Sequence, residues 1–332
     1  MTYAGARGRT LSQMRRVLHF NRISAKCSVH EGFRGLLTEL LATKYSHVLK
    51  VANRIFIDQR FSILDNFAYI TKHNYGAKAV KLPFFRTPNL ARKNINRWVS
   101  RKTDGKITSL LPRGSVTKQT ALTLVNAITF KGNWLYKFTG YETTLERFYK
   151  SKTTLVEMMR MTVAAPYLRY ANDRSLHAEI LELPYVDTRV AFYVVLPYRS
   201  SSLSALEQQF RWNPDALDLK PRRMLVRLPK FTVRSKVNLA GQLRDMGMRD
   251  LFGAADLRGI DGKRDLFVPG VFHEAYIKVS ETGTDAGAAT AVLQGKSYLR
   301  DFGETFVANR PYLFFIWDRS TSSLLFSGRF CG

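Results

Sequence analysis

The sequence carries few residues at spacings that could do catalytic or metal chemistry. It has no G-x-S-x-G, H-E-x-x-H or C-x-x-C motif, which would mark a hydrolase nucleophile, a zinc protease or a redox site. The chain has six histidines, and none of them lies three or four residues from another, as a metal-ligand pair on a helix would. They are His19, His30, His47, His73, His177 and His273. No Ser/His/Asp set can be chosen without geometry, so the residues predict neither an enzyme nor a metal site.

Two further features are weak as signals. The stretch QGKS (residues 294–297) is similar to the end of a phosphate-binding loop, but the required first glycine would fall at Thr290, so we reject a nucleotide site and expect no cofactor. Cys27 and Cys331 are the only cysteines and have no metal-ligand spacing. They predict either one bridge or two free thiols.

The stretch ETGTDAGAATAV (residues 281–292) is unusual because it contains almost no bulky side chain. Its composition alone favours a flexible Ala/Gly linker. As a strand, it would place residues 284, 286, 288, 290 and 292 on one small, nearly apolar face. Small side chains would let such a strand enter between existing strands without a clash, and would keep it from pairing prematurely in water.

The charge balance is strongly basic. The chain has 332 residues, with 52 Lys and Arg against 26 Asp and Glu, a net charge of +26. This favours polyanions such as sulfated glycans, nucleic acid or acidic membrane, although scattered charges also fit a generally basic, soluble surface. The denser basic clusters are Arg7/Arg9/Arg15/Arg16, Arg92/Lys93/Arg97/Arg101/Lys102/Lys106 and Lys220/Arg222/Arg223/Arg227.

The elements that must position these residues are mainly helices in the first third. Residues 10–20 have apolar side chains at helical spacing, with Thr10 as the expected N-cap. Residues 29–45 and 91–107 each carry an apolar stripe, which predicts a helix in each range. The helix over 91–107 is expected to end at Asp104-Gly105.

The later part of the chain is expected to form strands, several of them apolar on both faces as central strands are. No linker or repeat divides the chain, and no apolar run reaches the ~18 residues that span a bilayer. We therefore expect one domain over residues 1–332, of the α+β class with large, mostly antiparallel sheets. The expected strands are residues 120–130, 178–185, 190–198, 224–233, 272–280, 310–318 and 323–330.

Several blocks resemble the serpin family and occur in the family's order, over essentially the whole chain. HEAYIKVSETGTDAGAATAV (273–292) resembles the hinge that leads into the reactive-centre loop, and VANRPYLFFIWDRSTSSLLFSGRF (307–330) resembles the C-terminal signature. The other similar blocks are residues 91–116 (helix F and its return), 122–138 (the strand 3A region), 181–185 and 193–197 (strands 2B and 3B), and 228–233 with 243–260.

The resemblance implies a serpin fold, with an exposed reactive-centre loop at about 281–304. It also implies a monomeric suicide inhibitor of serine proteases rather than an enzyme. In this mechanism the protease cleaves the loop and forms an acyl-enzyme, and the hinge side inserts as a new strand in sheet A. The competing interpretations are a non-inhibitory carrier, chaperone or glycosaminoglycan-binding serpin, and an inactive truncated one.

The resemblance assigns the hinge to a run of small residues. Glu281 resembles the hinge acid and Gly283 the hinge glycine, and the inserting strand begins at Thr284. Gly287 departs from the family's usual alanine run, and glycine in a strand costs ~0.5–1 kcal/mol. The full set of hinge residues is Glu281, Gly283, Thr284, Asp285, Ala286, Gly287, Ala288, Ala289 and Thr290.

Four positions outside the hinge match residues that control the opening of sheet A in the family. Lys230 matches the lysine that pairs with the hinge acid. Asn126 and His273 match the shutter pair, and Trp134 matches the breach tryptophan under the top of the sheet. For each of these residues, plain core packing is the alternative interpretation.

Counting from the hinge glycine places the reactive bond at Ser297, with Tyr298 following. Ser297 would suit an elastase-like protease. A shift of one residue would make the bait Tyr298, for a chymotrypsin-type protease, or Lys296, for a trypsin-type one.

The resemblance leaves partners and compartment less defined. MTYAGARGRTLSQMRRVLHF (residues 1–20) resembles the end of helix B followed by helix C, so we expect the helix A and helix B region to be lacking here. The opening residues have neither the charged n-region nor the apolar h-region of a signal peptide, so we expect none in this sequence. Family habit favours a secreted, extracellular protein, with a cytoplasmic one as the alternative, and a sulfated glycan such as heparin is a possible partner beside the target protease.

Overall fold

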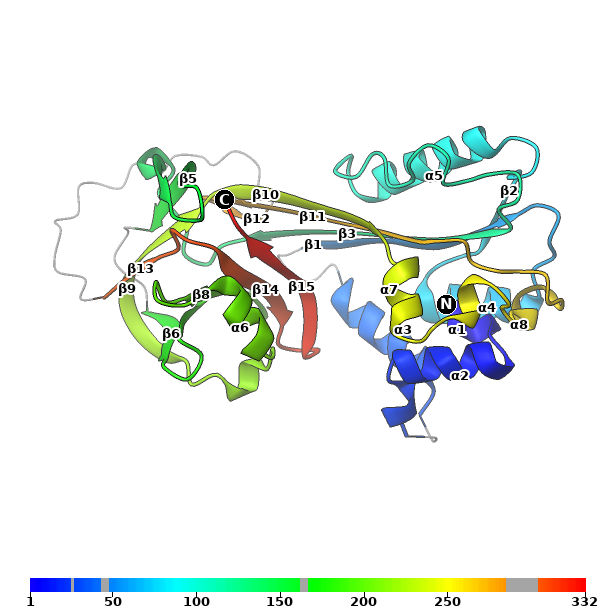
Figure 1. The fold of residues 1–332 in the computed structure, drawn as a ribbon, viewed down its shortest axis with the longest axis horizontal. Helices are drawn as coiled ribbons and strands as arrows, with labels where there is room; N and C mark the ends of the chain where they lie inside the picture. The colour runs from blue at the N-terminus through cyan, green and yellow to red at the C-terminus, as the bar shows by residue number, and fades with distance from the viewer. Residues whose placement is uncertain (25–26, 43–47, 162–166, 285–303) are drawn as a thin grey trace. The chain divides into compact units, whose positions relative to one another are not determined.

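The computed structural model describes residues 1–24, 27–42, 48–161, 167–284 and 304–332, which fall into two compact units (Figure 1). Unit 1 comprises Met1–Ala42, Leu49–Thr129 and Arg234–Tyr276. Unit 2 comprises Thr43–Val48, Phe130–Val233 and Ile277–Gly332.

Most helices belong to unit 1, and three of them correspond to the helices expected from the sequence. No described helix is long and apolar enough to cross a bilayer. The helices of unit 1 are α1 (Thr2–Gly5), α2 (Gly8–Val17), α3 (Val29–Leu40), α4 (Asp65–Tyr75), α5 (Pro88–Lys102), α7 (Ala240–Asp245) and α8 (Arg258–Asp261), and unit 2 contains α6 (Leu203–Gln209).

Within the described residues the strands form two sheets, in the orders β10-β11-β12-β3-β1-β2 and β15-β14-β8-β7-β6-β9-β5-β4, with β13 beside β9. Most pairings in the second sheet are antiparallel, as the α+β prediction requires. The strands are β1 (Val48–Asp58), β2 (Val80–Leu82), β3 (Leu122–Asn133), β4 (Thr144–Phe148), β5 (Thr154–Met161), β6 (Tyr167–Asp173), β7 (Ala178–Pro184), β8 (Val190–Pro197), β9 (Lys220–Pro229), β10 (Phe231–Asn238), β11 (Val271–Ser280), β12 (Gly283–Thr284), β13 (Glu304–Val307), β14 (Tyr312–Asp318) and β15 (Ser323–Phe330).

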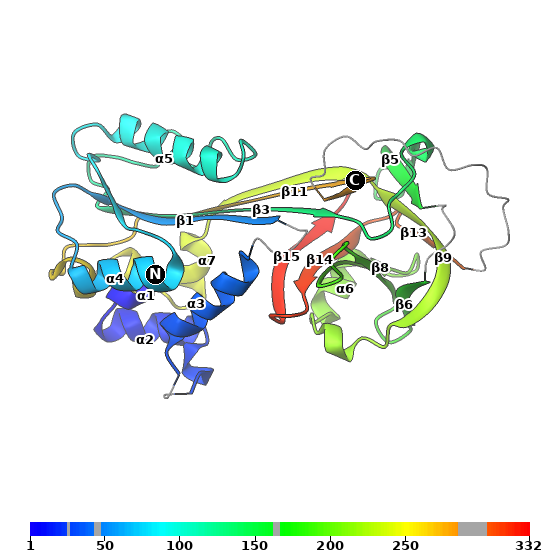
Figure 2. The ribbon, with the colours of Figure 1, turned by 180° about the vertical axis from the view of Figure 1, so that it is seen from behind.

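The sheet segments of unit 1 are covered on both faces. Ala127 of β3 packs in one core cluster with Ile95 and Val99 of α5. Leu122, on the opposite face of the same strand, packs in another cluster with Met14 of α2. Both ribbon views place α5 on one side of β1 and β3, and α1, α2 and α4 on the other (Figures 1 and 2).

The core of unit 2 lies against α6. Ile180 of β7, Tyr193 of β8 and Phe315 of β14 pack in one cluster with Leu206 of α6. Every residue of β8 is buried. This confirms the expectation that a run apolar on both faces forms a central strand.

Two details of the expected elements are wrong. α2 begins at Gly8, two residues before the expected N-cap, and the hydroxyl of buried Thr10 accepts a hydrogen bond from the amide of Asp256 instead. The run 224–233 is two strands, because β9 ends at Pro229 and β10 starts at Phe231. Lys230 lies at this break, and proline, which has no amide hydrogen, suits the end of a ladder.

Candidate functional site

The short strand β12 occupies the end of the space between β3 and β11. Residues 124–129 of β3 pair in parallel with residues 271–276 of β11. Farther along, β12 runs antiparallel to both strands, with Thr284 opposite Gly132 on β3 and Val279 on β11. Gly283 and Thr284 of the hinge therefore already occupy two residue positions of an added strand.

Gly283 is held in a conformation and a space that suit only glycine. Its φ is +150°, and a Cβ atom there would fall 2.0 Å from the carbonyl oxygen of Gly132. Backbone atoms cannot give way as a flexible side chain can, so any other residue would push β12 away from β3. The family's glycine at this position thus has a local physical reason in this chain.

Trp134 lies directly beneath the turn before β12. It is 1% exposed, and its indole Nε1 donates a hydrogen bond of 2.8 Å to the carbonyl oxygen of Ser280. Its backbone amide donates to the carbonyl of Thr282 over 3.0 Å. Its ring stacks on Tyr185 with centroids 4.7 Å apart. The tryptophan thereby fixes both ends of the 280–282 turn.

Tyr185 binds the first residue of the expected inserting strand. Its hydroxyl and the Thr284 hydroxyl lie 2.7 Å apart, and both residues are completely buried. Burial raises the pKa of Tyr185 well above its ordinary value, against the smaller opposing effect of the Thr284 hydrogen bond. The phenol therefore stays neutral and can donate this bond at any physiological pH.

Glu281 is anchored by side chains from two other segments. Its Oε1 accepts a hydrogen bond of 2.8 Å from the Thr143 hydroxyl and pairs with Nζ of Lys230 at 3.2 Å. Burial alone would raise the pKa of Glu281, but hydrogen bonds from its own amide, Thr143 and Lys230 outweigh it and hold the pKa below the ordinary value. The carboxylate is therefore ionised, and it ties the hinge to the β9–β10 break.

The Asn126–His273 pair lies elsewhere, in unit 1. The two residues are directly opposite each other on β3 and β11, and Nδ1 of His273 is 2.6 Å from Oδ1 of Asn126. Because the amide oxygen accepts, Nδ1 carries the hydrogen. Burial lowers the pKa of His273, which favours the neutral ring.

The described residues thus bring Glu281, Gly283 and Thr284 together with Trp134 and Lys230. Sequence reasoning missed Thr143, for which the sequence offered no signal, and Tyr185, although the latter ends a block that resembles a family strand. The remaining predicted residues, which lie outside the described residues, are Asp285, Ala286, Gly287, Ala288, Ala289, Thr290, Lys296, Ser297 and Tyr298.

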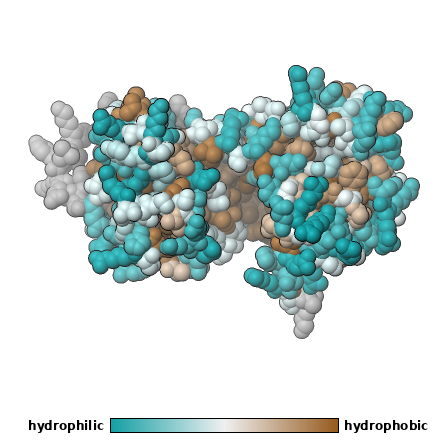
Figure 3. All heavy atoms as spheres, in the orientation of Figure 1, coloured by the Kyte–Doolittle hydropathy of each residue, from teal (hydrophilic) through white to brown (hydrophobic). Residues whose placement is uncertain are grey.

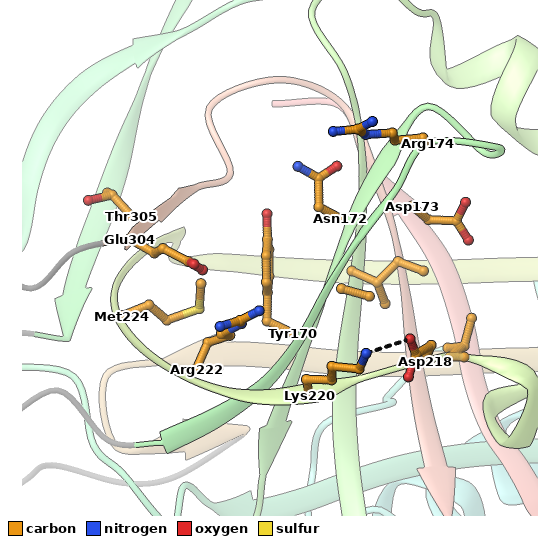
Figure 4. A pocket seen from close by; sticks show the side chains of 13 residues that line it. Tyr170, Asn172, Asp173, Arg174, Asp218, Lys220, Arg222, Met224, Glu304 and Thr305 are labelled. Atoms are coloured by element: carbon orange, nitrogen blue, oxygen red, sulfur yellow. Dashed lines mark ion pairs between the residues drawn. The ribbon is translucent and has the colours of Figure 1, made fainter.

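A separate cavity of about 670 Å³ in unit 2 lies at the start of β13 (Figure 4). Its lining mixes both charges, with Arg222 beside Tyr170 and an ion pair of 3.2 Å between Lys220 and Asp218. Glu304 lines the cavity as well. With cations and anions interleaved, the cavity has no single charge preference.

Groups that could hold a metal or form a bridge are sparse. In the described ranges, no three His, Cys, Asp or Glu side chains come close enough together to hold a metal ion. Cys27 and Cys331 are free thiols, both exposed. Of the two alternatives left open by the sequence, two free thiols is the one found.

Comparisons with known proteins agree with these features. The family model for "Serpin (serine protease inhibitor)" matches residues 1–332. Serpin B3 of Homo sapiens is 35% identical, over 99% of this chain and 89% of its own length. The leukocyte elastase inhibitor of Bos taurus is 38% identical, over 99% and 88%.

The fold matches solved serpin structures as well. The crystal structure of Serpin48, described as a highly specific serpin in the insect Tenebrio molitor, superposes with a TM-score of 0.86 at 29% identity, covering 99% of this chain and 86% of that one. The family model, these relatives and this structure all match nearly the entire chain. The chain is a member of the serpin family of serine protease inhibitors.

Proposed function

We propose that this serpin inhibits a serine protease as a suicide substrate, using the segment that follows the hinge as bait. The observation that carries the proposal is β12, where Gly283 and Thr284 run antiparallel between β3 and β11. A cleaved segment needs a sheet position to enter, and these two residues mark the entrance to it. The sequence similarity to the leukocyte elastase inhibitor of Bos taurus, at 38% identity, supports a protease as the target.

The proposed chemistry begins at the Ser297–Tyr298 bond, with Lys296 or Tyr298 as the alternative bait residue. The protease serine oxygen bonds to the carbonyl carbon of Ser297, the bond to the nitrogen of Tyr298 breaks, and the released amine takes up the proton that the serine loses. Hydrolysis of the resulting ester would free the protease. Inhibition requires that insertion of the hinge side disrupts the protease before water completes that step.

Insertion is favoured by backbone pairing. A strand that extends from Thr284 through Thr290 would gain ladder hydrogen bonds to both neighbours, each worth ~0.5–1.5 kcal/mol net. Asp285, Ala286, Gly287, Ala288 and Ala289 are all small enough to enter. Gly287 would weaken the new strand slightly.

The residues around the hinge receive roles within this proposal. Glu281 and Lys230 hold the hinge before cleavage, and Trp134 supports the turn beneath it. The side chains of Asn126 and His273 bridge β3 and β11. This contact resists separation of the two strands until a new strand enters between them. The chain acts as one serpin domain and as a monomer, without enzymatic turnover of its own.

The compartment proposed here differs from family habit. Similarity to Serpin B3, Serpin B6 and leukocyte elastase inhibitors fits the cytoplasmic alternative better than secretion. We therefore place the proposed inhibitor in the cytoplasm. Fractionation of cells that make the protein checks this, because recovery in the medium would contradict it.

The test is to mix the full chain with trypsin, chymotrypsin and elastase, and to separate the products on denaturing gels. We expect an SDS-stable complex with at least one protease, and mass spectrometry of the released fragment identifies the reactive bond. Thr284→Arg is the matched variant, because a buried charge beside Tyr185 should block insertion and turn the chain into a substrate.

The outcomes separate the competing functions. Cleavage without any complex, but with a raised melting temperature of the cleaved chain, would indicate insertion that is too slow to trap the protease. Cleavage with neither a complex nor a raised melting temperature would reject the proposal and favour a non-inhibitory or inactive serpin.

A further inference from the structure

The helix α3 is attached to the rest of unit 1 without a buried residue. None of its twelve residues is buried, although Phe33, Leu36, Leu37 and Leu40 form an apolar stripe. Phe33 and Leu37 line a cavity of about 360 Å³ that also borders β1 and β3. Atoms that line a cavity lack neighbours on one side, so they contribute less packing energy than a filled interface would. In Figure 3 hydrophobic side chains reach the surface among hydrophilic ones over unit 1, which contains α3.

Two hydrogen bonds that involve histidine join α3 to the last turn of α4. Nη1 of Arg34 lies 2.6 Å from Nε2 of His73, and Nδ1 of His30 lies 2.7 Å from the hydroxyl of Tyr75. His30 and Arg34 are four residues apart, and therefore on the same face of α3. We call these two contacts the α3–α4 joint. Because no residue of α3 is buried, its attachment depends strongly on this joint.

The contact between Arg34 and His73 requires a neutral imidazole. A guanidinium only donates hydrogen bonds, so Nε2 of His73 must accept and carry no hydrogen. Protonation would place a hydrogen on Nε2 and a second positive charge against the guanidinium, which turns attraction into repulsion. The His73 ring stacks on Tyr69 with centroids 5.2 Å apart, and this stacking keeps the ring oriented as the bond needs it.

The contact between His30 and Tyr75 is sensitive to acid for a different reason. Burial lowers the pKa of His30, with a further lowering by the Met1 amino group. Burial raises the pKa of Tyr75 to about 12, so the phenol stays neutral. A lowered histidine pKa means that the folded state resists the proton. The stability from this group is full above the ordinary histidine value of about 6.5 and declines as pH falls from there towards the lowered pKa.

No acid offsets a new positive charge at the joint. In the described part of the chain, neither histidine nor Arg34 pairs with a carboxylate. The charged and titratable groups around the two rings are the Met1 amino group, Tyr3 of α1, Arg15 of α2, Glu31 and Arg34 of α3, and Tyr69, Lys72 and Tyr75 of α4. Glu31, the one acid in this set, is exposed, and neighbours in sequence do not share a helix face.

We propose that the α3–α4 joint is a pH switch, in which protonation of His30 and His73 releases α3 from α4 and opens the cavity beneath it. Acid adds charge to a joint that already holds the Arg34 cation, so α3 and α4 repel each other there. Segments with few buried contacts are those that open locally while the rest of a protein stays folded. The switch needs no protease, so its failure leaves the proposed inhibition intact.

The test is hydrogen exchange of the full chain, read by mass spectrometry at pH 7.5, 6.5 and 5.5. Correction for the intrinsic pH dependence of exchange gives protection factors for α3, with α5 as the internal reference. In the joint variant, His30→Gln/His73→Gln, the amide oxygen at position 73 can accept from Arg34 at any pH, because glutamine takes up no proton. The matched control is His19→Gln/His177→Gln, which removes two exposed histidines outside the joint. Unchanged α5 protection at pH 7.5 verifies that both variants fold.

We expect the protection of α3 in the wild-type chain to fall at least about fivefold between pH 7.5 and 5.5, which corresponds to one lost hydrogen bond. The control variant should respond in the same way, and the joint variant by less than about twofold. Constant α3 protection in the wild-type chain would overturn the proposal. So would an equal response in the joint variant, which would assign the effect to other groups, or an equal fall in α5, which would indicate general destabilisation.

Discussion

Gly283 shows how one missing side chain can position a functional segment. An alanine Cβ at this position would meet the backbone of Gly132 and Asn133. We expect Gly283→Ala to destabilise the fold by about 1–3 kcal/mol, from strain and displacement of β12. Urea unfolding measures this, with Gly241→Ala as control because a Cβ there meets nothing within 4 Å. Equal stability of both variants would contradict the tight fit.

Glu281 gives the hinge a dependence on pH. Its folded pKa is lowered, so the carboxylate contributes stability that is fully present above the ordinary glutamate value of about 4.3. This stability is lost as pH falls through the lowered folded pKa. Glu281→Gln should therefore flatten the melting temperature between pH 5 and 3, relative to wild type, as scanning calorimetry can record. An unchanged pH profile would show that the contacts with Lys230 and Thr143 add nothing.

Glu274 should behave in the opposite sense. Burial raises its pKa, against the opposing effects of Lys236 and Arg234, and its Oε2 has no hydrogen-bond partner. The folded state then binds the proton more tightly than the unfolded state, so this group costs stability as pH rises through the raised pKa. Glu274→Gln should raise the melting temperature at pH 7 but not at pH 4. A lower melting temperature at pH 7 would mean that the charge is needed by its cationic neighbours.

At the scale of elements, the Asn96 side chain joins α5 to the loop that follows it, because it bonds to both the amide and the carbonyl of Leu111. Asn96→Ala would leave the buried amide of Leu111 without a partner, whereas Arg92 still donates to the Leu111 carbonyl. We expect a loss of about 1–3 kcal/mol in urea unfolding. Asn94→Ala, on the solvent side of the same helix, should change stability by less than about 0.5 kcal/mol. Similar losses of unfolding free energy at both positions would show that the Asn96–Leu111 hydrogen bonds do not hold the loop to α5.

Element boundaries were predictable where the local chemistry is strong. The helix end at Asp104-Gly105 is confirmed, since both residues follow α5 with positive φ. β15 occupies the expected residues 323–330. The expected N-cap Thr10 is wrong because its hydroxyl serves a distant segment, the amide of Asp256. N-cap preferences depend only on residues that are close in the sequence, so they cannot predict a hydrogen bond to a distant segment.

Within the candidate site, only residues that lie in blocks resembling the family could be predicted from the sequence. The resemblance placed Lys230 with Glu281, which lie 51 residues apart. Thr143, which binds the same carboxylate, has no local pattern that would mark it. Contacts of this kind depend on how loops return to a strand end, and hydrophobic periodicity does not encode that.

At the scale of the whole chain, the net charge of +26 is the dominant property. Mutual repulsion of like charges disfavours a compact state, and salt screens it over a Debye length of about 10 Å at 0.1 M. We expect the melting temperature to rise as NaCl increases from about 20 to 200 mM. A melting temperature that falls with salt would indicate that ion pairs such as Arg189–Asp318 dominate instead.

The pairing of β12 with β3 and β11 also determines which residues would lie opposite each other if the strand continued beyond Thr284. With Thr284 opposite Gly132 and Val279, a regular antiparallel continuation brings Thr290 between Asn126 and His273. The threonine would then separate the two side chains that now join β3 and β11 directly. Insertion would thus exchange one polar cross-link for another, and the environment of the His273 imidazole would report how far the strand has advanced.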